Sequence, residues 1–213
     1  MSKIKIPNYN IKEELINSIS HGLGAIFSIV VLVLCIIKAN GAKSIVSVVL
    51  YGVIMIILYV ISCIYHALPR NNRGKKVLRV LDHINVMLMV AGSYMPICLS
   101  LFNSVLGWWT FGIVWFITII AVVFNAIDVD KYTVVSALCN LILGWGVLVL
   151  IKPLLEVTTW SGVILLILGG VMYTIGSILY GIGAKVPYMH SIFHFFVLFG
   201  SIFHFIFIYL YCI

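Results

Sequence analysis

Long apolar stretches alternate with short polar ones along the chain, and this alternation is the strongest pattern in the sequence. About 20 consecutive apolar residues are enough for an α-helix to cross a bilayer. Seven stretches meet this length, and the connections between them are short and marked by residues typical of turns. The predicted spans are about 19–37, 44–68, 78–101, 107–127, 133–151, 160–181 and 188–212.

These spans predict an all-α integral membrane protein, built as a seven-transmembrane helix bundle with residues 1–213 in a single membrane domain. Short connections make consecutive helices antiparallel neighbours. The composition agrees, because 63% of the residues are hydrophobic and 9% are charged. Soluble domains have about 45–50% apolar and about 25% charged residues. The first span is too long for a signal-peptide core and lacks a small-residue cleavage signal, so we expect it to be retained.

Basic residues are divided unevenly between the two sides of the membrane. Ten of the 13 Lys and Arg residues precede the first span or follow the second, fourth and sixth spans. The positive-inside rule then predicts a cytoplasmic N-terminus, an external C-terminus and a multi-pass protein of the cell membrane. This topology explains the net charge of +7, which gives no reason to expect nucleic acid as a partner. The ten residues are Lys3, Lys5, Lys12, Arg70, Arg73, Lys75, Lys76, Arg79, Lys131 and Lys185.

Polar side chains within the spans gather on the predicted cytoplasmic side. The second span ends with "SCIYH", the third opens with "LDH" and the seventh opens with "HSIFH". Ser62 and His66 are four residues apart, so they share one helix face. The same spacing joins His190 and His194. Ionisable groups inside membrane spans are rare and usually functional, so we interpret these side chains, with Asp82, as one candidate site.

This set of residues has the chemistry of an open metal site. Three imidazoles from His66, His190 and His194, with one water, can form a four-coordinate Zn²⁺ site of the catalytic type. Asp82 can hydrogen-bond that water or act as its general base, and Ser62 can stabilise a developing oxyanion. Imidazoles also suit other first-row metals. The structural alternative is that these side chains only form hydrogen bonds between helices.

The roles of the other three histidines stay open. His204 lies near the face of His190 but about 21 Å further along the helix, too far to bind the same ion. We favour a hydrogen bond to another helix for His204. His21 lies at the right depth but has no paired partner, and is a supporting or structural candidate. His83 is expected near the headgroups, because it points about 100° away from Asp82.

Other residues predict helix geometry. Pro96 is expected to kink or locally break the third helix. Trp108, Trp109 and Trp160 fall at predicted outer ends, where an aromatic belt forms. Close helix approach or bending is expected at Gly144, Gly146, Gly169, Gly170 and Gly176.

Four stretches resemble the bacterial hemolysin III proteins: "EELINSISHGLGA", "SCIYHAL", "RVLDHINVMLMVAGSYMPICL" and "VPYMHSIFHFFVLFGSIFHF". That family is similar to the progestin and adipoQ receptors, which include the adiponectin receptors, and more distantly to alkaline ceramidases. The resemblance implies seven helices with a cytoplasmic N-terminus. It also implies a pattern of SxxxH in the second helix, Asp in the third and HxxxH in the seventh.

Matched residue by residue, the resemblance implies that His66, His190 and His194 are zinc ligands. It implies that Asp82 acts through a water and that Ser62 lies close by. It assigns no ligand role to His204.

Several functions remain open. The first is a zinc-dependent, ceramidase-like hydrolase of lipid amide or ester bonds that serves membrane lipid homeostasis, with a membrane lipid as substrate or ligand. The second is a non-enzymatic sensor of membrane state with a structural zinc. A cytolytic activity is less favoured, because so apolar a bundle has no water-soluble precursor form. A proton-coupled transporter is also less favoured, because the polar groups are concentrated at one side. The oligomeric state is not predicted.

Overall fold

The computed structural model describes residues 4–102 and 104–213. Lys3, one of the basic residues counted above, lies outside this part of the chain. Within it, seven helical segments are long and apolar enough to cross a bilayer, and there is no strand. The protein is therefore an all-α, multi-pass membrane protein, as the sequence predicted.

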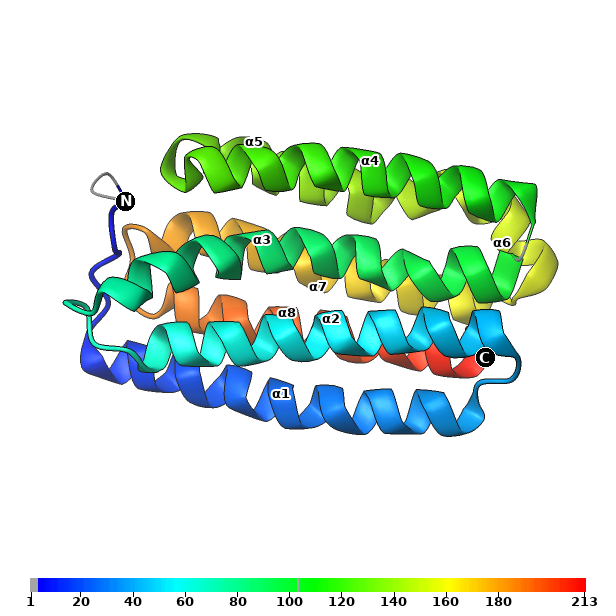
Figure 1. The fold of residues 1–213 in the computed structure, drawn as a ribbon, viewed down its shortest axis with the longest axis horizontal. Coiled ribbons are helices and arrows are strands. Elements are labelled where there is room, and N and C mark those ends of the chain that lie inside the picture. Colours follow the sequence, from blue (N-terminus) through cyan, green and yellow to red (C-terminus); the bar gives the residue numbers. More distant parts are fainter. Residues whose placement is uncertain (1–3, 103) are drawn as a thin grey trace.

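The helices lie side by side, with the N-terminus and C-terminus at opposite ends of the bundle (Figure 1). Helices α1 and α8 pack together, as do α7 and α8, so the last helix lies against the first and the seventh. We call the end that carries residues 4–10 the N-terminal end. The segments are α1 (Ile11–Lys38), α2 (Ala42–Ala67), α3 (Arg73–Met95), η1 (Pro96–Phe102), α4 (Val105–Ile127), α5 (Val129–Gly146), η2 (Val147–Leu150), α6 (Ile151–Val157), α7 (Trp160–Gly183), α8 (Met189–Phe207) and η3 (Ile208–Cys212).

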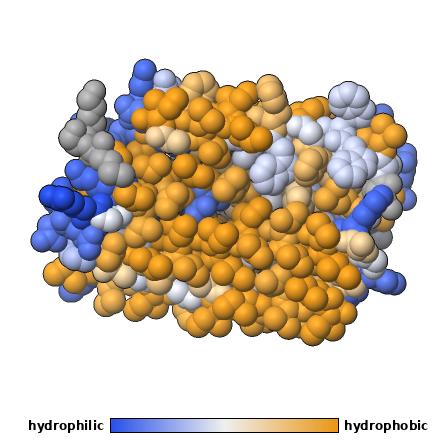
Figure 2. Space-filling view, viewed as in Figure 1, coloured by the Kyte–Doolittle hydropathy of each residue, from blue (hydrophilic) through white to orange (hydrophobic). Residues whose placement is uncertain are grey.

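The outer surface has the character of a lipid-facing one. Figure 2 shows a face covered mainly by hydrophobic residues, with hydrophilic residues concentrated at the two ends. Large apolar side chains such as Phe116 and Ile142 are exposed on this exterior. Trp108 and Trp160 are exposed at the starts of their helices, in positions suited to a membrane interface.

Several helices extend beyond the apolar stretches that predicted them. Helix α1 begins at Ile11 rather than near residue 19. Asn10 and Glu13 form a capping box, in which each side chain bonds the other's backbone N–H. This cap adds polar turns before the apolar stretch, so a polar segment that lies outside the predicted span becomes part of a transmembrane helix. Helix α3 similarly begins at Arg73, capped by Asn72.

Pro96 changes the geometry of the third span, as expected. The α-helix ends at Met95 and the chain continues as a π-helix from Pro96 to Phe102. Proline lacks the N–H that an α-helix needs at this point and its ring crowds the preceding turn. The wider turns accommodate this without breaking the span.

Glycines on α7 let α8 approach closely. Gly169, Gly176 and Gly183 are seven residues apart and so lie along one side of the helix. A Cβ at Gly183 would meet the backbone nitrogen of His190 at 2.8 Å. A Cβ at Gly169 would overlap the ring of His204. These glycines therefore set the position of α8 and of its histidines.

We expect Gly169→Ala to lower the stability of the bundle by about 1–3 kcal/mol, because the new methyl group must displace His204. Gly170→Ala is the matched control, since its Cβ would find the nearest atom, on Trp145, at 3.5 Å. Alanine favours a helix over glycine by about 1 kcal/mol, so the control should be neutral or slightly stabilising. Thermal unfolding of both variants in detergent measures the difference. Equal melting temperatures would show that α8 can shift without cost.

Candidate metal centre

Three histidines meet inside the bundle near its N-terminal end. His66 lies in the last turn of α2, and His190 and His194 lie in the first turns of α8. One candidate ligand atom from each residue lies within 4.8 Å of the others. Their exposed fractions are 1%, 5% and 1%, so all three rings are buried. The structure thus brings together the three predicted ligands, and this histidine cluster can hold a metal ion.

Two of the three histidines of the cluster have ring nitrogens at a spacing that suits one tetrahedral ion. His190 Nε2 and His194 Nε2 lie 3.1 Å apart. Two imidazole nitrogens bound to one tetrahedral zinc at about 2.0–2.1 Å would be about 3.3 Å apart. His66 Nε2 is buried and has no hydrogen-bond partner among the described residues. An unpaired buried acceptor is costly, and a bound cation would satisfy it.

The first helix supplies polar partners that the sequence analysis did not assign. Glu14 Oε2 lies 2.6 Å from His66 Nδ1, and Asn17 Nδ2 lies 3.4 Å from the same atom. His21 packs on the cluster, with its ring centroid 3.8 Å from that of His194. Glu14, Asn17 and His21 follow the i, i+3, i+7 spacing of one helix face. That spacing could have indicated that these three side chains share the face of α1 next to the cluster. It can be recognised only once α1 is known to begin at Ile11.

Asp82 and Ser62 lie beside the histidine cluster rather than in it. The Ser62 hydroxyl donates a hydrogen bond to the Asp82 carboxylate, which links α2 to α3. Ser62 is 1% exposed. Asp82 lies outside the group whose ligand atoms converge, but it lines the same pocket as His190. The chemical roles given to Asp82 and Ser62 stay predictions.

The two remaining histidines hold helices together. His83 Nδ1 lies 2.9 Å from the Arg79 carbonyl oxygen, and its Nε2 lies 2.8 Å from the Tyr180 hydroxyl of α7. His83 therefore contacts a neighbouring helix, whereas we expected its side chain to lie near the lipid headgroups. His204 hydrogen-bonds the backbone of Leu166 on α7, as expected from its position along α8.

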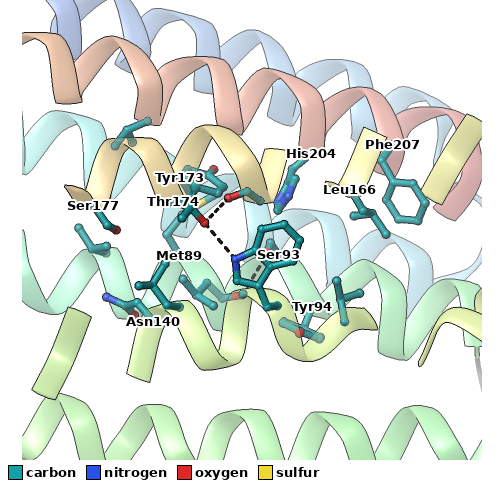
Figure 3. A pocket seen from close by; sticks show the side chains of 18 of the residues that line it. Met89, Ser93, Tyr94, Asn140, Leu166, Tyr173, Thr174, Ser177, His204 and Phe207 are labelled. Atoms are coloured by element: carbon teal, nitrogen blue, oxygen red, sulfur yellow. Dashed lines mark hydrogen bonds between the residues drawn. The ribbon is translucent and has the colours of Figure 1, made fainter. Parts of the chain in front are cut away.

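The pocket that contains Asp82 and His190 is also lined by His83 and Tyr180. A second, mainly apolar pocket lies deeper in the bundle, and Figure 3 shows side chains that line it. In its lining, Trp145 Nε1 donates to Thr174 Oγ1 at 2.9 Å. The two pockets share Val86, Asn140, Ser177 and Phe193. The pocket beside the histidine cluster and the mainly apolar pocket are therefore adjacent.

Residues before α1 cover the histidine cluster at the N-terminal end. The Tyr9 ring stacks on the His190 ring, with centroids 4.7 Å apart and planes 18° apart. Burial raises the pKa of the Tyr9 phenol, so the ring packs there in its neutral form. Arg70, from the α2–α3 connection, donates to the Ile6 carbonyl oxygen at 3.2 Å and holds this segment in place.

The fold and the site define a seven-span membrane protein with a buried three-histidine centre near one end. The chain belongs to the haemolysin-III related family, which it matches over residues 9–205. It is 39% identical over 194 residues to Hemolysin-3 of Bacillus cereus, covering 90% of this chain and 88% of that relative. It is 36% identical over 208 residues to the Hemolysin-3 homolog of Bacillus subtilis (strain 168), covering 96% and 97%. The resemblance seen in the sequence is thereby confirmed.

Proposed function

We propose that this chain is a zinc-dependent hydrolase that cleaves an amide or ester bond of a membrane lipid and so serves lipid homeostasis. One observation carries the proposal. His190 of the histidine cluster and Asp82 line one pocket, and that pocket shares four lining residues with a mainly apolar pocket. A lipid can place its carbonyl group beside the cluster and an acyl chain in the apolar pocket, where chain burial contributes about 0.8 kcal/mol per CH₂.

In this mechanism the chain's own residues bind, orient and move a proton. His66, His190 and His194 hold the zinc ion. When bound, zinc acts as a Lewis acid and makes water available as a nucleophile near neutral pH. The Asp82 carboxylate takes a proton from the attacking water as the water oxygen bonds to the lipid carbonyl carbon. Asp82 then gives that proton to the leaving amine or alcohol as the C–N or C–O bond breaks. Ser62 keeps Asp82 oriented through its hydrogen bond.

We place the N-terminal end of the bundle in the cytoplasm, because ten of the 13 basic residues fall on that side. The histidine cluster then lies near the inner leaflet. A cysteine at Lys185 in an otherwise cysteine-free variant tests this orientation. We expect an impermeant maleimide not to label that cysteine in intact cells. Labelling would show that the N-terminal end of the bundle faces the outside.

The activity is tested with purified protein in lipid nanodiscs, loaded with one equivalent of zinc and given a panel of ceramides, N-acyl amines and glycerolipid esters. Mass spectrometry of released fatty acid measures hydrolysis. We expect release from at least one class of lipid, lost on chelation and restored by zinc. Zinc-loaded protein that cleaves no lipid across the panel would contradict the proposal and favour the membrane-state sensor.

Filling the apolar pocket should change chain-length preference. Gly144 lines this pocket, and a Cβ placed there meets nothing within 4 Å. We expect Gly144→Leu to raise KM for a long-chain substrate about tenfold, because the leucine side chain takes the space of about two methylene groups of the acyl chain in this pocket. A short-chain substrate should be cleaved as by the wild type. Gly112→Leu on α4 is the matched control, since it is equally unobstructed and lies outside both pockets. Equal loss for both chain lengths would show that the acyl chain lies elsewhere.

The name of the Bacillus cereus relative suggests lysis of cells as an alternative function. Dose-dependent lysis of erythrocytes by purified protein, equal for wild type and His190→Ala, would favour that alternative. Our proposal expects no lysis that is independent of the histidine cluster.

A further inference from the structure

Two charged side chains connect the histidine cluster to helices that supply none of its members. Glu14, on α1, lies 2.6 Å from His66 Nδ1 through Oε2. Its other oxygen, Oε1, accepts a hydrogen bond from Lys75 Nζ of α3 at 2.6 Å. Lys75 is 1% exposed and also donates to the Leu68 carbonyl oxygen at 2.8 Å. The Lys75–Glu14–His66 chain therefore joins three helices.

The Glu14 carboxylate determines which nitrogen of His66 carries the proton. An ionised carboxylate only accepts hydrogen bonds, so at 2.6 Å from Glu14 the His66 Nδ1 is the N–H donor, and the longer 3.4 Å contact with Asn17 Nδ2 is not a hydrogen bond to that nitrogen. In the neutral ring this leaves the lone pair on Nε2. Nε2 is the His66 atom that has no partner among the described residues. The buried ammonium of Lys75 compensates the carboxylate's charge and fixes its second oxygen, so the carboxylate stays in place.

The other two histidines have no comparable support. His190 Nδ1 and His194 Nδ1 are buried and without hydrogen-bond partners in the described structure. Aromatic rings pack against them instead, from Tyr9 on His190 and from His21 on His194. His66 is thus the member of the cluster whose tautomer and ring orientation are set by a carboxylate.

We propose that Glu14 is a positioning residue of the metal centre: by accepting the Nδ1–H of His66 it presents Nε2 to a divalent cation. This inference rests on the proposed zinc site and adds to it that α1, which supplies no ligand, controls the affinity of the site. A carboxylate beside a ligating imidazole makes the ring more basic and holds it in place, and losing such a partner typically weakens metal binding about 10–100-fold.

The test compares zinc affinity by chelator competition in detergent-purified wild type, Glu14→Gln and Glu13→Gln. Glu13 is the matched control: it neighbours Glu14, but its carboxylate accepts from the backbone nitrogens of Asn10 and Tyr188 instead of a histidine. We expect Glu14→Gln to weaken zinc binding about 10–100-fold and Glu13→Gln to leave it unchanged. The ligand-field spectrum of the Co²⁺-loaded protein should shift only in Glu14→Gln.

A further variant separates positioning from folding, because Glu14→Gln leaves Lys75 buried without its counter-charge. Glu14→Gln combined with Lys75→Met removes that charge and should recover helix content and melting temperature, while zinc affinity stays low. Wild-type affinity and an unchanged Co²⁺ spectrum in both Glu14 variants would overturn the inference and leave the proposed zinc site standing. A wild type that binds no zinc would overturn both.

Discussion

Replacing His190 or His194 with alanine is expected to weaken zinc binding by about 100-fold or more, since in the proposed site each imidazole is one of three protein ligands and the binding free energy of such a site is of the order of 10 kcal/mol. Both residues are buried in the first turns of α8 and belong to the group whose ligand atoms converge. Hydrolysis of lipid should fall with the metal. Metal content per chain after desalting measures the first effect and fatty-acid release the second.

His204→Ala is the matched control for these variants. It removes the same side chain from the same helix, but His204 bonds Leu166 and lies away from the cluster. It should keep about one zinc per chain, with circular dichroism confirming helix content in all three variants. Full metal content in folded His190→Ala and His194→Ala would show that the zinc is bound by other ligands. The histidine cluster would then be an interhelical packing motif.

Asp82→Asn is expected to leave zinc binding intact and to lower kcat for lipid hydrolysis by about 10²–10⁴-fold, the usual contribution of a general base. Asparagine keeps the shape of the side chain and can still accept the hydrogen bond of Ser62, but it cannot take a proton from water. Asp82 lies outside the converging ligand atoms, so its loss should not release the ion.

The control for Asp82→Asn is Asp128→Asn, at the N-cap of α5, where asparagine can also accept from the backbone nitrogen of Lys131. Near-wild-type kcat in Asp82→Asn would remove Asp82 from the mechanism. Loss of zinc in that variant would instead make Asp82 part of what holds the ion. Either result changes the proposed role of one residue without altering the histidine cluster.

The two predictions also separate the hydrolase from the sensor. A structural zinc needs the histidines but gives Asp82 no proton to move. A protein that loses function in His190→Ala and keeps it in Asp82→Asn therefore behaves as a sensor. A hydrolase loses function in both.

Relations that lie within one helix could be predicted from the amino-acid sequence alone. Apolar stretches of sufficient length gave seven spans, because a bilayer accepts backbone only where its hydrogen bonds are satisfied internally. The 3.6-residue period placed His190 beside His194 and Ser62 beside His66, whatever the helices packed against. The rarity of ionisable groups in lipid marked the same residues, with Asp82, as functional.

Which helix faces contact one another depends on the tertiary packing and could not be predicted from the sequence. The distance between His66 on α2 and His190 on α8 depends on packing, and the glycines of α7 set the position of α8. Glu14 is the clearest case. In sequence it belongs to the polar segment before the first predicted span, but the Asn10 cap extends α1 and turns Glu14 toward His66 and Lys75. From the sequence alone, a polar residue near the end of a span is equally compatible with contact to water or with burial between helices. The packing of α1, α2 and α3 determines which of the two applies to Glu14.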